Sequence, residues 1–215
     1  LTRTPAELAR TDIADHALAV LAESKVKEVY LLGRRGPAQA AFTTPEVKEL
    51  GEMEQADAVA LAAEVTLDPL SAAEVERENE ATTKRKIEVL QQFAAAPPSG
   101  KPKRLIIRFL VSPVELIDDG AGRVGGIRVN HNRIVDKNGT LAAEATGTSE
   151  VLPVGLVFRS VGYQGVSIDG LPFDQRSATV PNASGRVTGT PGVYVAGWIK
   201  RGPSGVIGTN KPDAA

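Results

Sequence analysis

The chain has 215 residues, with 25 lysines and arginines against 26 aspartates and glutamates, and its formal net charge is −1. This balance argues against partners that select strongly basic proteins, namely nucleic acids and acidic membrane surfaces. Cysteine is absent, histidine occurs twice, and no run of about 18 apolar residues is present, which argues against a disulfide framework, a cysteine-bound metal or iron–sulfur centre, and a membrane-spanning helix.

Helices and short apolar runs alternate over the first hundred residues. Thr4, Pro5 and Glu7 have the spacing of a helix N-terminus, and apolar residues at helical intervals extend that helix through Glu23. A strand at 26–32 and a turn at 33–38 are expected next, followed by a short helix that starts at Pro45 with Thr44 as its cap. The apolar run at 58–61 fits either a strand or a short helix, and a charged helix is expected at 71–96. This order predicts an α/β fold with a parallel sheet.

A proline- and glycine-rich break at 97–102 separates this region from one with short strands and turns. Strands are predicted at 104–110, 113–117 and 124–129, a hairpin turn at 118–122, a polar turn region at 139–147 and an edge strand at 148–152, which together form a β-meander. Further on, we expect a buried strand at 156–163, a short strand at 185–187 and an apolar strand at 193–198.

The turn at 33–38 carries Arg34 and Arg35 directly after a predicted buried strand. In a dinucleotide-binding fold, the end of the second strand faces the adenosine ribose, and arginine there suits the 2′-phosphate of NADP. Guanidinium groups also match phosphate geometry in a bidentate manner. The pair is therefore a candidate phosphate site, and the alternative is a basic turn that faces only solvent.

A glycine-rich loop at 202–210 follows the last predicted strand and the single tryptophan, Trp198. Such a loop allows backbone N–H groups to approach a phosphate or a ring carbonyl closely. The alternatives are an ordinary turn for the loop and a large core aromatic for Trp198.

Three blocks of sequence together resemble the adrenodoxin reductase family, the FAD-dependent NADPH–ferredoxin reductases of mitochondria and bacteria. They are Thr11-Asp12-Ile13 with residues 32–43 and Glu46, then residues 158–163, and finally residues 192–210. The resemblance implies an α/β fold: an incomplete Rossmann-like NADP-binding domain with a β-meander at 1–155, and part of the FAD-binding domain of a two-dinucleotide flavoprotein at 156–215.

The resemblance also implies roles for individual residues. Arg34 and Arg35 match the pair that holds the NADPH 2′-phosphate, and Glu46 matches an acidic residue near the nicotinamide nucleotide. On the flavin side, Trp198 matches a tryptophan lying against the flavin and nicotinamide, and Gly205, Val206 and Ile207 match the backbone that contacts the flavin ring.

The family's glycine fingerprints for FAD and for the NADP pyrophosphate do not occur in this chain. We therefore expect a fragment that lacks the N-terminal FAD segment and the first βα unit of the NADP domain. We expect it to be inactive alone, whereas the intact protein would be a ferredoxin–NADP⁺ reductase using FAD and NADP, with electrons passing from NADPH to flavin and then singly to ferredoxin.

The partner expected from the resemblance is a ferredoxin, with neither nucleic acid nor a membrane span involved. A basic patch at Lys84, Arg85 and Lys86 could steer it, although the interspersed glutamates also fit a solvated helix face. The expected compartment is the bacterial cytoplasm, or the mitochondrial matrix in a eukaryote. Two other functions stay open: a related NADPH-dependent flavoprotein such as the small subunit of glutamate synthase, and a non-enzymatic NADP-binding module.

Overall fold

The computed structural model describes residues 1–205 and 211. It divides the chain into two compact units, Leu1–Leu156 and Val157–Ala215. Within the described residues, no helix is both long enough and apolar enough to cross a bilayer, and no group of acidic, histidine or cysteine side chains has the arrangement of a metal site.

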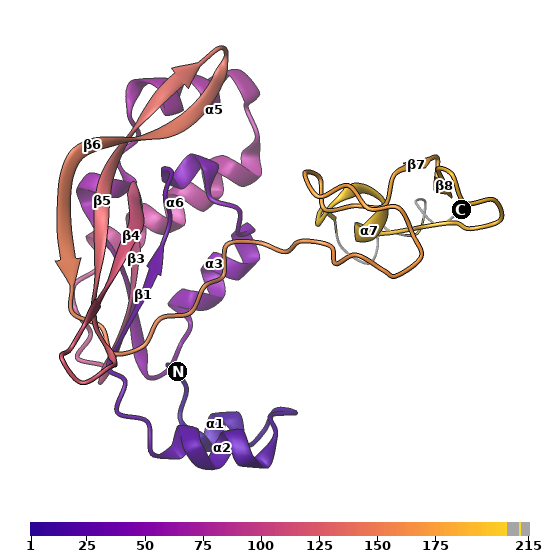
Figure 1. Ribbon diagram of the computed structural model, residues 1–215. Coiled ribbons are helices and arrows are strands. Elements are labelled where there is room, and N and C mark those ends of the chain that lie inside the picture. The colour runs from indigo at the N-terminus through magenta and orange to yellow at the C-terminus, as the bar shows by residue number, and fades with distance from the viewer. Residues whose placement is uncertain (206–210, 212–215) are drawn as a thin grey trace. The chain divides into compact units, whose positions relative to one another are not determined.

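A parallel sheet lies at the centre of the first unit (Figure 1). It contains β1 (Glu28–Leu32), β2 (Ala56–Ala60) and β3 (Lys103–Arg108) in the order β1-β3-β2. The predicted parallel sheet is confirmed, and the ambiguous apolar run at 58–61 falls mainly in a strand. All three strands run in one direction, so their carboxyl ends meet at one edge of the sheet.

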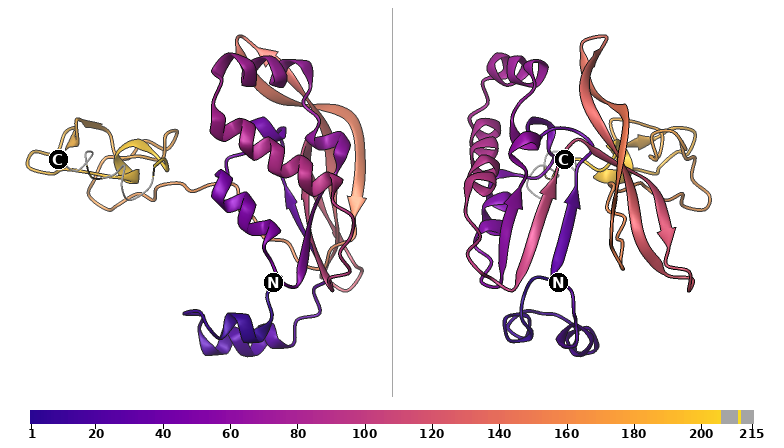
Figure 2. Two further views of the ribbon diagram at one scale, coloured as in Figure 1. Left: turned by 180° about the vertical axis from the view of Figure 1, so that it is seen from behind. Right: turned by 90° about the vertical axis from the view of Figure 1, so that its left-hand side faces the viewer.

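Helices cover one face of this sheet (Figure 2, right). They are η1 (Pro37–Gln39), α3 (Thr44–Gly51), α4 (Ala62–Val65), α5 (Pro69–Glu78) and α6 (Ala81–Ala95). Apolar side chains of α3, α4 and α6 meet those of β2 and β3 in a core that includes the fully buried Val47, Leu90 and Ile107. The apolar stripe of α6 supplies the centre of this core, as its helical spacing predicts.

An antiparallel sheet covers the opposite face (Figure 2, right). Its strands β4 (Val111–Asp118), β5 (Val124–Lys137) and β6 (Thr140–Leu152) pair in chain order, which confirms the meander predicted from residue 113 onward. The strand expected at 104–110 does not belong to it, because it pairs with β1 and β2 as β3 of the parallel sheet. Val111 and Val129 are fully buried in a core that also contacts Tyr30 and Leu32 of β1. The central strand β3 is thus buried on both faces from Leu105 to Arg108, which explains its apolar run, whereas Leu31 of the edge strand β1 is 42% exposed.

The prediction of a polar turn region at 139–147 is wrong beyond Gly139, because residues 140–147 belong to β6. Lys137 pairs with Thr140, so the connection between β5 and β6 is only Asn138 and Gly139, with φ of 58° and 81°. An Asn-Gly pair with positive φ at both positions is the favoured two-residue hairpin turn. The polar residues that follow form a strand that is largely exposed to solvent.

Two predicted helices are each split in the structure. The helix expected to run through Glu23 consists of α1 (Pro5–Leu8) and α2 (Asp15–Ala22), although the Thr4–Glu7 capping box at its start is confirmed. The helix expected at 71–96 is interrupted between α5 and α6, where Asn79 adopts a left-handed conformation with φ of 51°. Asparagine tolerates that conformation better than most residues, and it ends helices for this reason.

The second unit contains little regular structure in its described part. It has the two-residue strands β7 (Asn182–Ala183) and β8 (Arg186–Val187) and the short helix α7 (Trp198–Arg201). The short strand predicted at 185–187 corresponds to β8. The strands predicted at 156–163 and 193–198 are wrong. The first segment pairs with no described strand, and the second forms only a single bridge, between Tyr194 and Arg186. An apolar run becomes a buried strand only where another strand pairs with it. Val161 of the first segment is 85% exposed.

Candidate functional site

Arg34 and Arg35 lie at the carboxyl edge of the parallel sheet, directly after β1. Both residues are exposed, and the chain then turns into η1 through the buried Gly36 and Pro37. Ligands of open α/β sheets bind outside the carboxyl ends of the strands. The predicted phosphate-binding pair is therefore at the edge where such a ligand would lie.

The backbone of this turn is held at three consecutive carbonyl groups. The carbonyl of Gly33 accepts from the N–H of Val111 at 3.1 Å, and that of Arg35 accepts from Leu110 N–H at 3.1 Å. Between them, the carbonyl of Arg34 accepts from the side-chain amide of Asn132 at 2.9 Å. The arginine side chains therefore project from a fixed frame, and they do not have to hold the turn together themselves.

The two guanidinium groups have no acidic partner in the part of the chain that the structure describes. None of the ion pairs there includes Arg34 or Arg35. Within the described residues, the side chains of the pair make one hydrogen bond, from Arg35 Nη2 to the carbonyl of Gln39 at 3.4 Å. Two adjacent, exposed and unneutralised guanidiniums form an anion-binding surface.

Glu46 has a structural role in α3. Its carboxylate accepts from the backbone N–H of Thr43 at 2.6 Å, and its own N–H donates to the Thr43 hydroxyl at 3.5 Å. This bond from the backbone of Thr43 lowers the pKa of Glu46. The helix cap is therefore Thr43, one residue before the predicted Thr44, because a glutamate three residues after the cap completes a capping box. No hydrogen bond or ion pair among the described residues joins Glu46 to the arginine turn.

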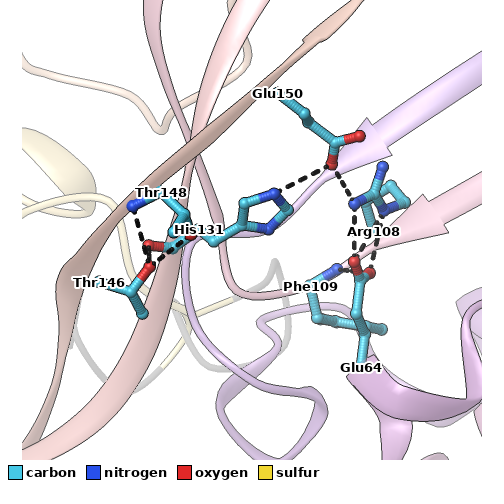
Figure 3. A network of polar contacts seen from close by, with 7 residues as sticks. All are labelled: Glu64, Arg108, Phe109, His131, Thr146, Thr148 and Glu150. Atoms are coloured by element: carbon cyan, nitrogen blue, oxygen red, sulfur yellow. Dashed lines mark hydrogen bonds and ion pairs between the residues drawn. The ribbon is translucent and has the colours of Figure 1, made fainter.

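A buried charge network adjoins the same edge of the sheet (Figure 3). Arg108, the last residue of β3, has a side chain only 7% exposed, and it bonds Glu64 of α4 at 2.8 Å and Glu150 of β6 at 2.5 Å. Glu64 also accepts from the N–H of Phe109, and His131 lies 3.7 Å from Glu150. Burial acts to lower the pKa of Arg108, but its two carboxylate partners raise it overall. The network connects α4 and β6 to β3. Its only signal in the sequence is an arginine that ends an apolar strand.

The predicted flavin-side residues lie in the second unit. Trp198 begins α7, is 42% exposed, and its Nε1 donates to the carbonyl of Gly205 at 3.4 Å. Its ring lies 5.4 Å from that of Tyr163, centroid to centroid. Val206 and Ile207 fall outside the described residues. The structure thus brings Trp198 and Gly205 together and adds Tyr163, and an exposed aromatic pair beside a glycine loop suits a flat, conjugated ligand.

The expected basic patch on α6 needs correction, because Lys86 is buried. Its side chain is directed into the protein, where Nζ donates to the carbonyl of Ala40 at 2.6 Å and lies 5.8 Å from the ring centroid of Phe42. Burial lowers the pKa of Lys86. Lys84 and Arg85 are each paired with a glutamate, so the surface of α6 is a charge-balanced helix face.

The chain has extensive similarity to known oxidoreductases. It is 47% identical over 219 residues to NADPH-ferredoxin reductase FprA of Mycobacterium leprae, and 38% identical over 227 residues to the human mitochondrial NADPH:adrenodoxin oxidoreductase. Both alignments include the whole of this chain but only 46% and 45% of the relative. The chain therefore spans about half the length of the curated relatives it matches.

Solved structures show the same similarity. The structure of Mycobacterium tuberculosis FprA in complex with NADPH aligns with a TM-score of 0.89 and 48% identity, over 98% of this chain and 45% of that one. A His57Gln mutant of the same protein also aligns with a TM-score of 0.89. No protein-family model matches the chain.

Proposed function

We propose that this chain, which is homologous over its full length to part of the NADPH–ferredoxin reductases of the adrenodoxin reductase family, belongs to an enzyme that transfers electrons from NADPH to a ferredoxin through FAD. The observation that carries the proposal is the similarity over the whole chain to FprA, together with an unneutralised arginine pair at the carboxyl edge of a parallel sheet. The alternatives, a glutamate synthase-type subunit and a non-enzymatic module, have no comparable support.

The proposed role of Arg34 and Arg35 is to bind the 2′-phosphate of NADPH. Their exposure, the absence of an acidic partner in the described residues and their place directly after β1 all support this role. Their turn follows a strand of the sheet and carries arginine where NAD-binding folds carry an acidic residue. Residues 1–155 would then form the NADP-binding part of the enzyme, and Glu46 would lie near the nicotinamide nucleotide.

Residues 156–215 would form part of the FAD-binding domain, with Trp198, Gly205, Val206 and Ile207 lining the flavin and nicotinamide. The exposed ring of Trp198, its contact with Gly205 and its neighbour Tyr163 fit such a ligand. Bound FAD would supply the hydride acceptor and the one-electron donor for ferredoxin, and the protein would contribute binding and orientation. Exposed apolar side chains at Phe158 and Val161 are those that a complete domain would cover.

The ferredoxin would bind at a surface that does not include Lys86, because that side chain is buried. Lys84 and Arg85 are accessible, but their ion pairs with glutamates reduce the positive potential that could steer an acidic partner. We keep the bacterial cytoplasm or the mitochondrial matrix as the proposed compartment.

The test uses the full-length protein that contains this chain. Its visible absorption spectrum should show bound flavin, and it should reduce a ferredoxin with NADPH as the electron source. A preparation of folded protein without flavin, or NADPH oxidation that never reduces a one-electron iron–sulfur acceptor, would contradict the proposal.

A further inference from the structure

Asn132 is a buried polar residue on β5 with an unusual set of partners. It is 8% exposed, and both hydrogens of its side-chain amide are used: one bonds the carbonyl of Arg34 at 2.9 Å, and the other bonds the hydroxyl of Ser112 at 2.7 Å. The first of these bonds joins residues 98 positions apart in sequence. A buried amide is costly unless its donors are satisfied, so this one belongs to a specific arrangement.

Asn132 lies where the pairing of β5 with β6 is irregular. The buried positions of β5 are Gly126, Ile127 and Val129 before the irregularity, and Asn132 and Ile134 after it. The register shift falls between Asn130, which pairs with Ser149, and Asn132, which pairs with Ala145, so the extra residues lie on β6. β5 stays in regular register with β4 from Val129 to His131, so Asn132 lies on the same face as Asn130 and its partner Ser112, opposite to Val129. Irregularities of this kind are frequent next to functional sites.

The backbone around Asn132 completes the connection to the arginine turn. Its N–H donates to the carbonyl of Leu110 at 2.7 Å, and Leu110 in turn donates to the carbonyl of Arg35 at 3.1 Å. Leu110 has a φ of 57°, a conformation that is strained for a branched side chain. Backbone strain of this kind persists where the surroundings enforce it. Asn132 therefore supports both arginine positions, directly at Arg34 and through Leu110 at Arg35.

We propose that Asn132 is a positioning residue that sets the specificity for the 2′-phosphate, an inference that rests on the proposed role of Arg34 and Arg35. The peptide planes on either side of an arginine fix the direction of its Cα–Cβ bond. Without the side-chain bond from Asn132, the peptide group after Arg34 can rotate. The Cα–Cβ bonds of Arg34 and Arg35 are then no longer held in one fixed relative direction. Bidentate binding of the 2′-phosphate requires that geometry, whereas binding of the parts that NADPH shares with NADH does not depend on it.

The experiment compares Asn132→Ala and Asn132→Asp with Ser112→Ala in the full-length protein. The two substitutions at Asn132 remove the bond to Arg34, whereas Ser112→Ala removes only the other bond of the same amide, and so it controls for a general loosening of β4 and β5. The readouts are the Kd of 2′,5′-ADP by calorimetry, the ratio of kcat/KM for NADPH to that for NADH, and the melting temperature. Arg34→Ala is measured in parallel.

The Asn132 variants should raise the Kd of 2′,5′-ADP, and lower the NADPH to NADH ratio, by about twofold to tenfold, the range expected for one lost neutral hydrogen bond. The kcat at saturating NADPH and the values for Ser112→Ala should stay near those of the parent.

Two outcomes would overturn the inference: no change in affinity or ratio in a folded Asn132 variant, or failure of both Asn132 variants to fold while Ser112→Ala folds, which would assign Asn132 to the stability of the fold. If Arg34→Ala also leaves the Kd of 2′,5′-ADP unchanged, the proposed phosphate site itself is wrong. If Arg34→Ala weakens binding and the Asn132 variants do not, only the inference about Asn132 fails.

Discussion

Removing one arginine of the pair should impair the use of NADPH far more than that of NADH. A hydrogen bond between charged groups contributes about 1.5–3 kcal/mol, and the exposure of Arg34 and Arg35 to solvent and salt favours the lower part of that range. Arg34→Ala or Arg35→Ala in the full-length protein should therefore lower kcat/KM for NADPH by about tenfold to fortyfold. The value for NADH should change by less than about threefold, because NADH has no 2′-phosphate.

The structure also predicts that these variants fold normally. Neither guanidinium has an ion pair in the described residues, and the turn is held by main-chain bonds and by Asn132. The free energy of unfolding should thus change by no more than about 0.5 kcal/mol. Arg77→Ala is a suitable control, because its side chain is 71% exposed on α5 and has only long contacts with glutamates. Steady-state kinetics at low and high salt, with a denaturation curve for each variant, provide the measurements. Equal losses with both nucleotides would refute the 2′-phosphate assignment.

Three further predictions concern stability. Glu46→Gln should keep the capping bond to Thr43 at neutral pH, whereas Glu46→Ala should lose it. Because folding lowers the pKa of Glu46, the parent should be more stable than the Gln variant above about pH 4.5, and this difference should disappear as the pH falls through the lowered pKa. Urea titrations at several pH values can check this. Arg108→Met should cost about 3–5 kcal/mol, because it removes the guanidinium partner of the mostly buried Glu64 carboxylate, and a loss below about 1 kcal/mol in urea unfolding would contradict this. Gly165→Ala should lower the melting temperature because the new methyl group would collide with the backbone oxygen of Ala178, whereas Gly155→Ala, which meets no atom within 4 Å, should not.

Local sequence signals were sufficient for the first unit wherever apolar periodicity and helix caps decided the structure. The strand before Arg34, the capping box at Thr4 and the charged helical region after residue 71 all followed from spacing. The β6 error arose because a solvated strand has few apolar residues, although the Asn138-Gly139 pair was a usable hairpin signal. Burial of Lys86 could not be foreseen, since it depends on a carbonyl 46 residues away.

The candidate site was predictable only in the residues that would touch a ligand. Arg34 and Arg35 are visible as a basic turn after an apolar strand, but Asn132 lies about a hundred residues away on a strand whose register irregularity has no clear sequence signature. The strand expected at 156–163 failed for a related reason. Its apolar pattern is real, yet the described part of the second unit provides no strand to pair with it. Long-range partners decide both cases.

The separation between the arginines and the frame that holds them has a consequence for the evolution and engineering of cofactor preference. The bonds that fix the turn use the main chain of residues 33–35 and 108–111 and the amide of Asn132, so they are indifferent to the side chains at positions 34 and 35. Substitutions there can accumulate without unfolding the turn. One or two substitutions at these positions should thus be enough to change the cofactor preference from NADPH toward NADH, while Asn132 and the β3–β4 connection stay unchanged and keep the turn folded.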